Sequence, residues 1–296
     1  MSAPLRSFVP LPAVLAAPPG PPGALPWPAL CDGVYCIVTT TPSGRARWPK
    51  LRLALREAQL LTDAALAVVN AGPCGEHGEP VTSQPTALIW SHLSAVLHAR
   101  AAGLERVLLL EDDVYFALPE LRRLLTACAA TAFRAAQLEA AALYLGGVHV
   151  STQPSERFGL HRGRAFQTHA YVAHVRHPAW DRLLAAARAD TALMFDTLLF
   201  THAGPCWLAQ PSVAFQRSFG QGTPAKWVLE GVPPLCRGLT HVLSWFDVGN
   251  CWETCACTTN GLVAVFGSIA AAVTALGALA VLLVALLWCL GRRAWR

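Results

Sequence analysis

Residues 106–116, RVLLLEDDVYF, constrain the fold most strongly, because an aliphatic run leads directly into three carboxylates. Such a near-continuous aliphatic run is typical of a strand that is covered on both faces of a sheet. The chain has only 18 acidic residues, yet Glu111, Asp112 and Asp113 stand side by side where this strand should end. Adjacent carboxylates repel one another and cost free energy when buried, so we expect a positive group to compensate them.

The segments around this strand alternate between two periodicities. Apolar β-branched runs predict strands at residues 33–39, 65–72, 106–110, 142–150 and 169–175, and amphipathic or Ala-rich and Leu-rich stretches predict helices at residues 48–62, 87–102, 118–142 and 180–188. Strand, helix and strand in succession are typical of a parallel sheet. We therefore expect an α/β domain with a mainly parallel central sheet. In such sheets ligands bind beyond the carboxyl ends of the strands, where the acidic triplet lies.

A divalent cation is the simplest compensating group for the triplet. If strand geometry continues through it, Glu111 and Asp113 project to one side and Asp112 to the other. Two carboxylates on one side can hold Mg²⁺ or Mn²⁺ and leave coordination positions for water and for nucleotide phosphates. The metal would offset the charge on a departing diphosphate. The alternative is a solvated loop whose carboxylates lie near the start of the next helix.

A second feature is the apolar segment at residues 261–290, which has no ionisable side chain except Cys289. Roughly 20 such residues cross a bilayer, so we predict a transmembrane helix and a lipid bilayer as a partner. The arginines of the tail at residues 291–296 place that tail in the cytosol by the positive-inside rule. They also supply more than half of the net charge of +5, so no nucleic-acid partner is expected.

The remaining stretches divide the chain further. Residues 1–30 are expected to be a Pro/Gly-rich leader or a weak signal peptide, residues 31–240 the folded domain, and residues 241–260 a Cys-rich juxtamembrane segment. With a signal peptide, the domain lies in the lumen of the endoplasmic reticulum or Golgi; without one, the chain is tail-anchored with a cytosolic domain. Cys31 and Cys36 are candidates for a disulfide. The juxtamembrane cysteines are candidates for disulfides or lipidation: Cys251, Cys255 and Cys257.

Several stretches together resemble glycosyltransferase family 25, which includes lipooligosaccharide and procollagen galactosyltransferases. The most specific match is IWSHLSAVLHARAAGLERVLLLEDDV, in which Ser91 and His92 precede the acidic triplet in a helix. FQTHAYVAHVRHPAWDRLL, MFDTLLF and AQPSVAFQRSFG are also similar to the family, and the similarity covers about residues 33–222. The first strand departs from the family, because IVTTTPSGRAR stands where the family has an Asn-Leu-x-Arg type sequence.

The resemblance implies a GT-A-like fold and the transfer of a hexose, galactose or glucose, from a UDP-sugar to a glycan or to a protein hydroxyl. It assigns Glu111 and Asp113 to the metal and the diphosphate, and Asp112 to the ribose or sugar side of the donor and to catalysis. Asp196 would take the proton of the acceptor hydroxyl. Further contacts are implied for Arg45, Ser91 and His92 on the donor and for His169 on the metal.

Each of these assignments has a structural alternative. Asp196 could be the N-cap of the following helix, Ser91 and His92 could have only structural contacts, and His169 could lie on the surface. At the level of function, the alternative is a catalytically inactive relative that binds a glycan or a protein partner. A metal-dependent hydrolase or nucleotidyltransferase would need a second acidic cluster, whereas the other acids are scattered: Asp63, Glu76, Asp181 and Asp190.

Overall fold

The structure is a computed structural model of the 296-residue chain. It describes residues 5–16, 25–131, 133, 137–154, 160–190, 194–216, 266–268, 270–279 and 281–282. The juxtamembrane cysteines and the basic tail expected from the sequence lie outside the described residues.

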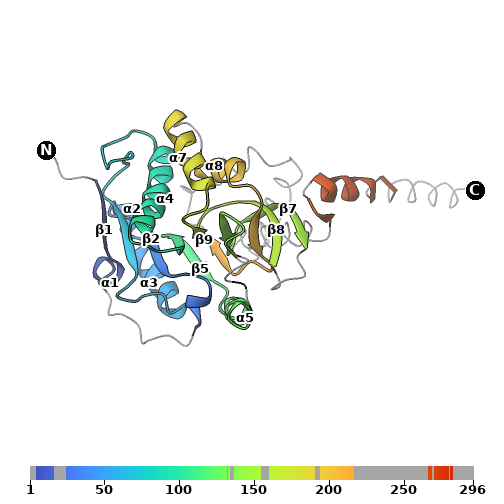
Figure 1. Cartoon of the computed structure of the whole chain (residues 1–296), viewed down its shortest axis with the longest axis horizontal. Coiled ribbons are helices and arrows are strands. Elements are labelled where there is room, and N and C mark those ends of the chain that lie inside the picture. Colours follow the sequence, from blue (N-terminus) through green and yellow to red (C-terminus); the bar gives the residue numbers. More distant parts are fainter. Residues whose placement is uncertain are drawn as a thin grey trace, which may run out of the picture.

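A nine-stranded mixed sheet forms the centre of the molecule, in the order β1-β3-β2-β4-β9-β6-β10-β8-β7 (Figure 1). Its strands are β1 Arg6–Pro10, β2 Gly33–Thr39, β3 Leu66–Asn70, β4 Arg106–Glu111, β6 Ala142–Tyr144, β7 Val148–Pro154, β8 Leu160–Phe166, β9 Ala170–His174 and β10 Cys206–Ala209. A second, two-stranded sheet pairs β5 (Val114–Phe116) with β11 (Ala214–Gln216).

The sheet is less parallel than we expected. Strands β3, β2 and β4 run parallel, as do β6 and β10, but the other neighbouring pairs are antiparallel. The difference from the expected parallel sheet arises at β9, which lies between β4 and β6 and pairs antiparallel with both. Residues 107–110 of β4 are fully buried, as predicted for a central strand. Burial on both faces produces the same aliphatic pattern whichever way the neighbouring strands run.

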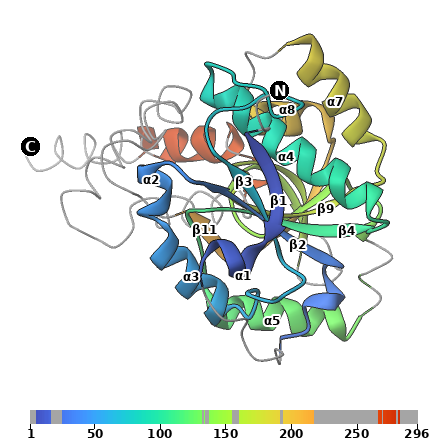
Figure 2. The ribbon, with the colours of Figure 1, turned by 90° about the vertical axis from the view of Figure 1, so that its left-hand side faces the viewer.

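Helices cover both faces of the sheet (Figure 2). One core cluster joins the sheet to α1 (Leu11–Val14), α3 (Trp48–Glu57) and α5 (Leu118–Ala129). The other joins the opposite face to α4 (Gln84–Ala101), α7 (Ala179–Ala189) and α8 (Phe195–His202). Two further short helices are η1 Trp27–Ala29 and α2 Pro42–Arg45. Helices α3 and α4 therefore lie on opposite faces of the sheet.

Two expected elements have different bounds. The helix predicted at residues 118–142 ends at Ala129 in the structure, and residues 142–144 form β6 instead. The strand predicted at residues 142–150 is divided between β6 and β7, which lie at different places in the sheet. Gly147 between them has a φ of 119°, a conformation that favours glycine and separates the two strands.

Residues 6–15 belong to the fold, although we expected a leader over residues 1–30. Strand β1 pairs antiparallel with β3, and Leu11 and Leu15 are fully buried. The guanidinium of Arg6 donates to the backbone oxygens of Cys74 and Gly75 at 2.9 and 2.8 Å. These contacts place residues 6–15 in the folded part of the chain, and a leader or signal-peptide role for residues 1–30 stays a prediction.

Cys31 and Cys36 are separate buried thiols rather than the disulfide that their spacing suggested. Cys36 lies within β2 between two paired strands, where its side chain packs in the core. Burial raises the pKa of the Cys31 thiol to about 12, which keeps it protonated and unreactive.

Near the C-terminus, residues 270–279 are helical, and Gly267 accepts a hydrogen bond from the backbone of Thr152 at 2.8 Å. Of the helices that the structure describes, none is both long enough and apolar enough to cross a membrane. Much of the predicted span, residues 261–290, lies outside the described residues, and the span stays a prediction.

Candidate active site

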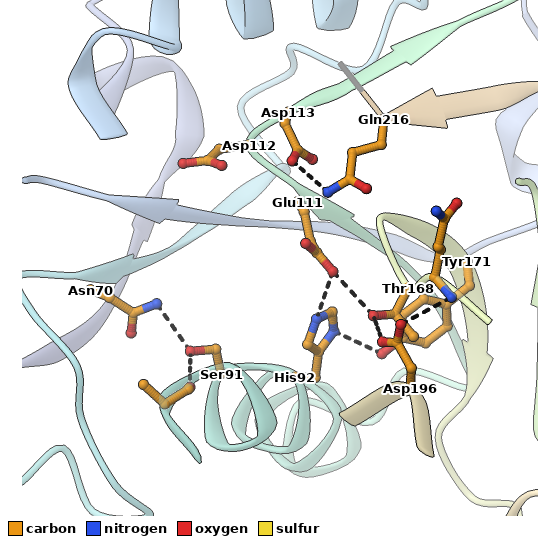
Figure 3. A network of polar contacts seen from close by, with 12 residues as sticks. Asn70, Ser91, His92, Glu111, Asp112, Asp113, Thr168, Tyr171, Asp196 and Gln216 are labelled. Atoms are coloured by element: carbon orange, nitrogen blue, oxygen red, sulfur yellow. Dashed lines mark hydrogen bonds and ion pairs between the residues drawn. The ribbon is translucent and has the colours of Figure 1, made fainter. Parts of the chain in front are cut away.

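The acidic triplet lies at the carboxyl end of β4, beside the carboxyl end of its parallel neighbour β2. Strand β4 ends at Glu111, and the chain turns through Asp112 and Asp113 before β5 begins. The alternation that would place Glu111 and Asp113 on one side therefore does not hold. Each carboxylate instead has its own surroundings (Figure 3).

Glu111 faces the α4 side of the sheet. Its Oε1 lies 3.3 Å from Nε2 of His92 and 3.1 Å from the hydroxyl of Thr168. That hydroxyl also lies 3.0 Å from Oδ1 of Asp196. A hydroxyl has a single hydrogen to donate, so both contacts are hydrogen bonds only when one carboxyl group of the pair carries a proton. Burial, and then the charge of Asp196, raise the pKa of Glu111 to about 7.

Ser91 and His92 are held by protein atoms, which favours the structural alternative for both over direct donor contact. The hydroxyl of Ser91, 1% exposed, donates to the Ala87 carbonyl at 2.7 Å and accepts from the Asn70 amide at 3.0 Å. The ring of His92 stacks on Phe195, and its Nδ1 lies 3.0 Å from the Tyr171 hydroxyl. Burial lowers the pKa of His92 to about 3, so the ring is neutral and its contact with Glu111 is not an ion pair.

Asp112 faces the α3 side, where Arg47 is its partner. Nη1 of Arg47 lies 3.0 Å from Oδ1 of Asp112. Arg45, the arginine that we expected at the donor, instead places its guanidinium 5.8 Å from the ring centre of Trp48. Burial raises the pKa of Asp112 to about 7 although Arg47 opposes the shift. The arginine beside the carboxylates is thus Arg47.

Asp113 is bound to the small sheet. Its Oδ2 accepts a hydrogen bond of 2.7 Å from the side-chain amide of Gln216, and it is 4% exposed. Burial, and then the charge of Glu111, raise its pKa to about 7. Oδ1 of Asp113 and Oδ2 of Asp112 are buried and have no hydrogen-bond partner in the described structure. Buried carboxylate oxygens without donors are costly, and they are suitable ligands for a hard divalent cation.

His169 does not join these carboxylates. It is 2% exposed, which excludes the surface position that was its alternative, and its Nε2 lies 3.2 Å from the carbonyl oxygen of Ala214. Among the described residues, no three His, Cys, Asp or Glu side chains are grouped so that they could hold one metal ion. Glu111, Asp113 and His169 are therefore not a preformed set of three ligands. A Mg²⁺ ion bound by one or two carboxylates and by substrate phosphates needs no such set.

Asp196 lies in the first turn of α8 but is not its N-cap, which is Met194. Its Oδ2 accepts a hydrogen bond of 3.1 Å from the backbone of Gln167, and its Oδ1 contacts Thr168. The N-cap alternative is thus wrong, because Met194 is the N-cap. The carboxylate of Asp196 binds the loop before β9 instead. Burial raises the pKa of Asp196 above its usual range.

The sequence did not indicate two residues of the site, Thr168 and Asn70. Thr168 contacts the carboxyl groups of Glu111 and Asp196, and the amide of Asn70 donates a hydrogen bond to Ser91. Asn70 lies near the end of the strand predicted at residues 65–72, and Thr168 directly precedes the strand predicted at residues 169–175. A search for polar residues at the ends of neighbouring strands would have found Asn70. Thr168 precedes the antiparallel strand β9, so finding it required the strand order.

The sequence matches no protein-family model and no curated protein. Among solved structures, the chain is similar to a mannose-1-phosphate geranyltransferase from Thermus thermophilus, with 15% identity and a TM-score of 0.34 over 60% of this chain and 73% of that one. It is also similar to a glycosyltransferase involved in the glycosylation of the major capsid of PBCV-1, with 11% identity and a TM-score of 0.33 over 53% of this chain and 66% of that one. Similarities this low assign no activity to this chain.

Proposed function

We propose that the chain is a metal-dependent glycosyltransferase with a nucleotide-sugar donor. One observation carries the proposal: two buried carboxylates, each with an oxygen that has no hydrogen-bond partner among the described residues, stand at the carboxyl end of a central strand, where α/β sheets bind their ligands. The raised pKa values of Asp112 and Asp113 support it, because burial disfavours the charged carboxylates that a bound cation would stabilise.

Asp112 and Asp113 are the residues that would hold the cation, because each has a buried carboxylate oxygen without a partner in the part of the chain that the structure describes, and such oxygens fit a hard metal ion. When bound, Mn²⁺ or Mg²⁺ would supply Lewis-acid stabilisation of the departing diphosphate. Arg47 lies beside Asp112 and can contact diphosphate oxygens with its guanidinium. Gln216 fixes the orientation of Asp113 through its amide.

Asp196 and Glu111 would handle the proton of the acceptor hydroxyl. Both belong to one hydrogen-bonded unit through Thr168, and the pKa of Glu111 is raised to about 7. A base is most effective when its pKa lies near the working pH. Burial also raises the pKa of Asp196. In this unit Asp196 takes the proton of the acceptor, and the hydroxyl of Thr168 holds the carboxyl group of Asp196 in place against that of Glu111.

The finer assignments come from the resemblance to family 25. They are a UDP-sugar donor that carries galactose or glucose, an acceptor that is a glycan or a hydroxylated protein, and an anchor at residues 261–290 with the domain in the endoplasmic reticulum or Golgi lumen. They extend the proposal that the carboxylate site supports.

The test is the release of UDP by the purified full chain with UDP-galactose or UDP-glucose and Mn²⁺, with and without glycan acceptors. We expect Asp113→Ala to abolish release, and Asp63→Ala, a change of an exposed acid, to leave it unchanged. Release that is insensitive to Asp113→Ala would refute the proposed mechanism. Donor binding without any release would instead support the alternative of a catalytically inactive protein.

A further inference from the structure

The chain near its C-terminus is paired with the last strand of the large sheet. Strand β7 stands at the end of the strand order, with β8 on one side. On its other side Ser268 pairs antiparallel with Ser151, and the backbone of Thr152 donates to the carbonyl oxygen of Gly267 at 2.8 Å. At this point the open edge of the sheet is therefore covered by the apolar segment at residues 261–290.

A sharp turn connects this pairing to a helix. Gly267 has a φ of 79°, a conformation that favours glycine. The hydroxyl of Ser268 accepts a hydrogen bond of 3.1 Å from the backbone of Ala271, and its carbonyl oxygen accepts one of 3.0 Å from Ala272. Such contacts satisfy the free N–H groups at the start of a helix. Residues 270–279 are helical, so the helix begins within two residues of the sheet edge.

Beyond its first turn, the helix exposes apolar residues on all sides. Ala272 is buried, but every residue that the structure describes at positions 276–282 is exposed and apolar. The most exposed side chains are Leu279 at 62%, Val281 at 68% and Leu282 at 66%. The helix leaves the domain beside β7 and extends away from it (Figure 1). A helix that is apolar all round is stable when it is buried in protein or in a membrane.

The bridge to β7 also fixes where a bilayer can begin. Open sheet edges do not occur within the hydrocarbon region, so Ser151 and Ser268 must lie outside it. The 22 residues at 269–290 remain, and they carry no charged side chain. As a helix they would be about 33 Å long, which matches a hydrocarbon core of about 30 Å. Trp288 and Arg292 stand at the far end, and both residue types are typical of a membrane interface.

We propose that residues 269–290 are a lipid-spanning anchor that is docked on β7, so that this strand joins the domain to the bilayer. The inference rests on the anchor of the proposed function and moves its start from residue 261 to residue 269. Five strand spacings separate β7 from β4, or about 24 Å along the sheet at about 4.8 Å each. The docked anchor thus holds the carboxylate site at a fixed distance from the lipid.

The first test examines the junction in the full chain, reconstituted in phosphatidylcholine vesicles. Residues that stand opposite each other in an antiparallel pair have Cα atoms about 4.5–5.5 Å apart, within the range that a disulfide requires. Ser151→Cys with Ser268→Cys should therefore crosslink under mild oxidation at least about tenfold more than Ser151→Cys with Leu279→Cys. Leu279 is the matched control, because it lies about 16 Å further along the helix. Equal crosslinking of the two pairs would overturn the docked junction.

The second test determines what surrounds the helix. The five cysteines outside the described residues are changed to serine in every variant, and the five buried ones are kept. Bimane on Leu279→Cys should lose at least about half of its fluorescence in vesicles whose lipid carries a nitroxide on the acyl chain. Bimane on Ser7→Cys, in exposed β1 at the opposite end of the sheet, should keep its fluorescence.

An unquenched bimane at Leu279→Cys would overturn the proposal, and a crosslink between two copies through that position would then identify a second copy as the occupant. Neither test uses a donor, so both are independent of UDP release. Crosslinking and quenching in a protein that releases no UDP would leave the docked anchor in place and refute the proposed function. UDP release by a protein whose helix is not quenched would refute the anchor and leave the function in place.

Discussion

The side-chain amide of Gln216 donates a hydrogen bond of 2.7 Å to Oδ2 of Asp113, and this contact joins the small sheet to the acidic turn. The pairing of β11 with β5 creates it, since Gln216 stands opposite Val114 in the register. With Oδ2 held in this way, Oδ1 is the oxygen of Asp113 that is left for a cation.

We expect Gln216→Leu to weaken Mn²⁺ binding by about 10-fold to 100-fold, because a group that orients a metal ligand typically contributes this much to affinity. Isothermal titration of the full chain with Mn²⁺ measures the change. Gln84→Leu, at an exposed position, is the control and should titrate like wild type. Equal affinities for Gln216→Leu and wild type would show that Asp113 does not bind the metal.

The acidic turn also predicts how stability depends on pH in the absence of metal. The pKa of Asp113 is raised from 3.8 to about 7 in the folded state, so folding favours its neutral form. Its contribution to stability is complete below about pH 4 and is lost as the pH rises through 7. Asp113→Asn cannot ionise, and in EDTA it should melt a few degrees above wild type at pH 8 but close to wild type at pH 4.

Thermal melts at both pH values, with exposed Asp63→Asn as the control, measure this difference. Added Mn²⁺ should reverse the order at pH 8, because only wild type retains the ligand that the ion stabilises. A melting difference between Asp113→Asn and wild type that is the same at pH 4 and pH 8 would contradict the raised pKa of Asp113.

The sequence predicted the local parts of the fold better than their arrangement. The aliphatic run of β4 and the periodicity of α4 result from burial within each element, so the pattern alone revealed them. The order of the strands depends on tertiary packing, and nothing local to residues 169–175 indicated that β9 would lie antiparallel beside β4. The edge strand β1 was missed because the prolines and alanines near it suggested a leader.

The same distinction holds at the candidate site. The acidic triplet and Asp196 stood out by residue type, but their partners depend on strand order and on the turn after Glu111. Arg47 and Arg45 were equivalent in the sequence, and only the course of the chain into α3 brings Arg47 to Asp112. No sequence pattern marked Thr168 as a site residue, because its contact with Glu111 depends on the pairing of β9 with β4.

The bridging hydroxyl of Thr168 leads to a prediction about activity. Thr168→Val keeps the shape of the side chain but removes the group that lies between Glu111 and Asp196. The two carboxyl groups would lose their shared hydrogen bonds, at a cost of about 1–3 kcal/mol for a buried polar group left unsatisfied. We expect kcat for UDP-sugar turnover to fall by about tenfold or more.

Thr168→Ser retains the hydroxyl and is the matched control, with turnover close to that of wild type. A structural role alone would lower the stability of Thr168→Val and leave the pH profile of kcat unchanged. A shift of that profile in Thr168→Val, absent in Thr168→Ser, separates the positioning role from simple destabilisation.

The last prediction concerns Arg6 and the expected leader. Its guanidinium donates to the backbone oxygens of Cys74 and Gly75, to Ser94 at 2.9 Å and to Asn70 at 3.3 Å. Arg6→Met would fill much of the same space and leave these acceptors without a donor, so we expect a loss of about 2–4 kcal/mol in the free energy of unfolding. Urea denaturation of the purified full chain measures it.

Ser7→Ala is the matched control, because Ser7 is the next residue of β1 and its side chain is exposed. It should unfold within about 0.5 kcal/mol of wild type. Intact-mass analysis of protein isolated from cells shows whether residues 1–30 are retained. If they are removed in the mature protein, or if Arg6→Met is as stable as wild type, then β1 does not support the loop beside the candidate site.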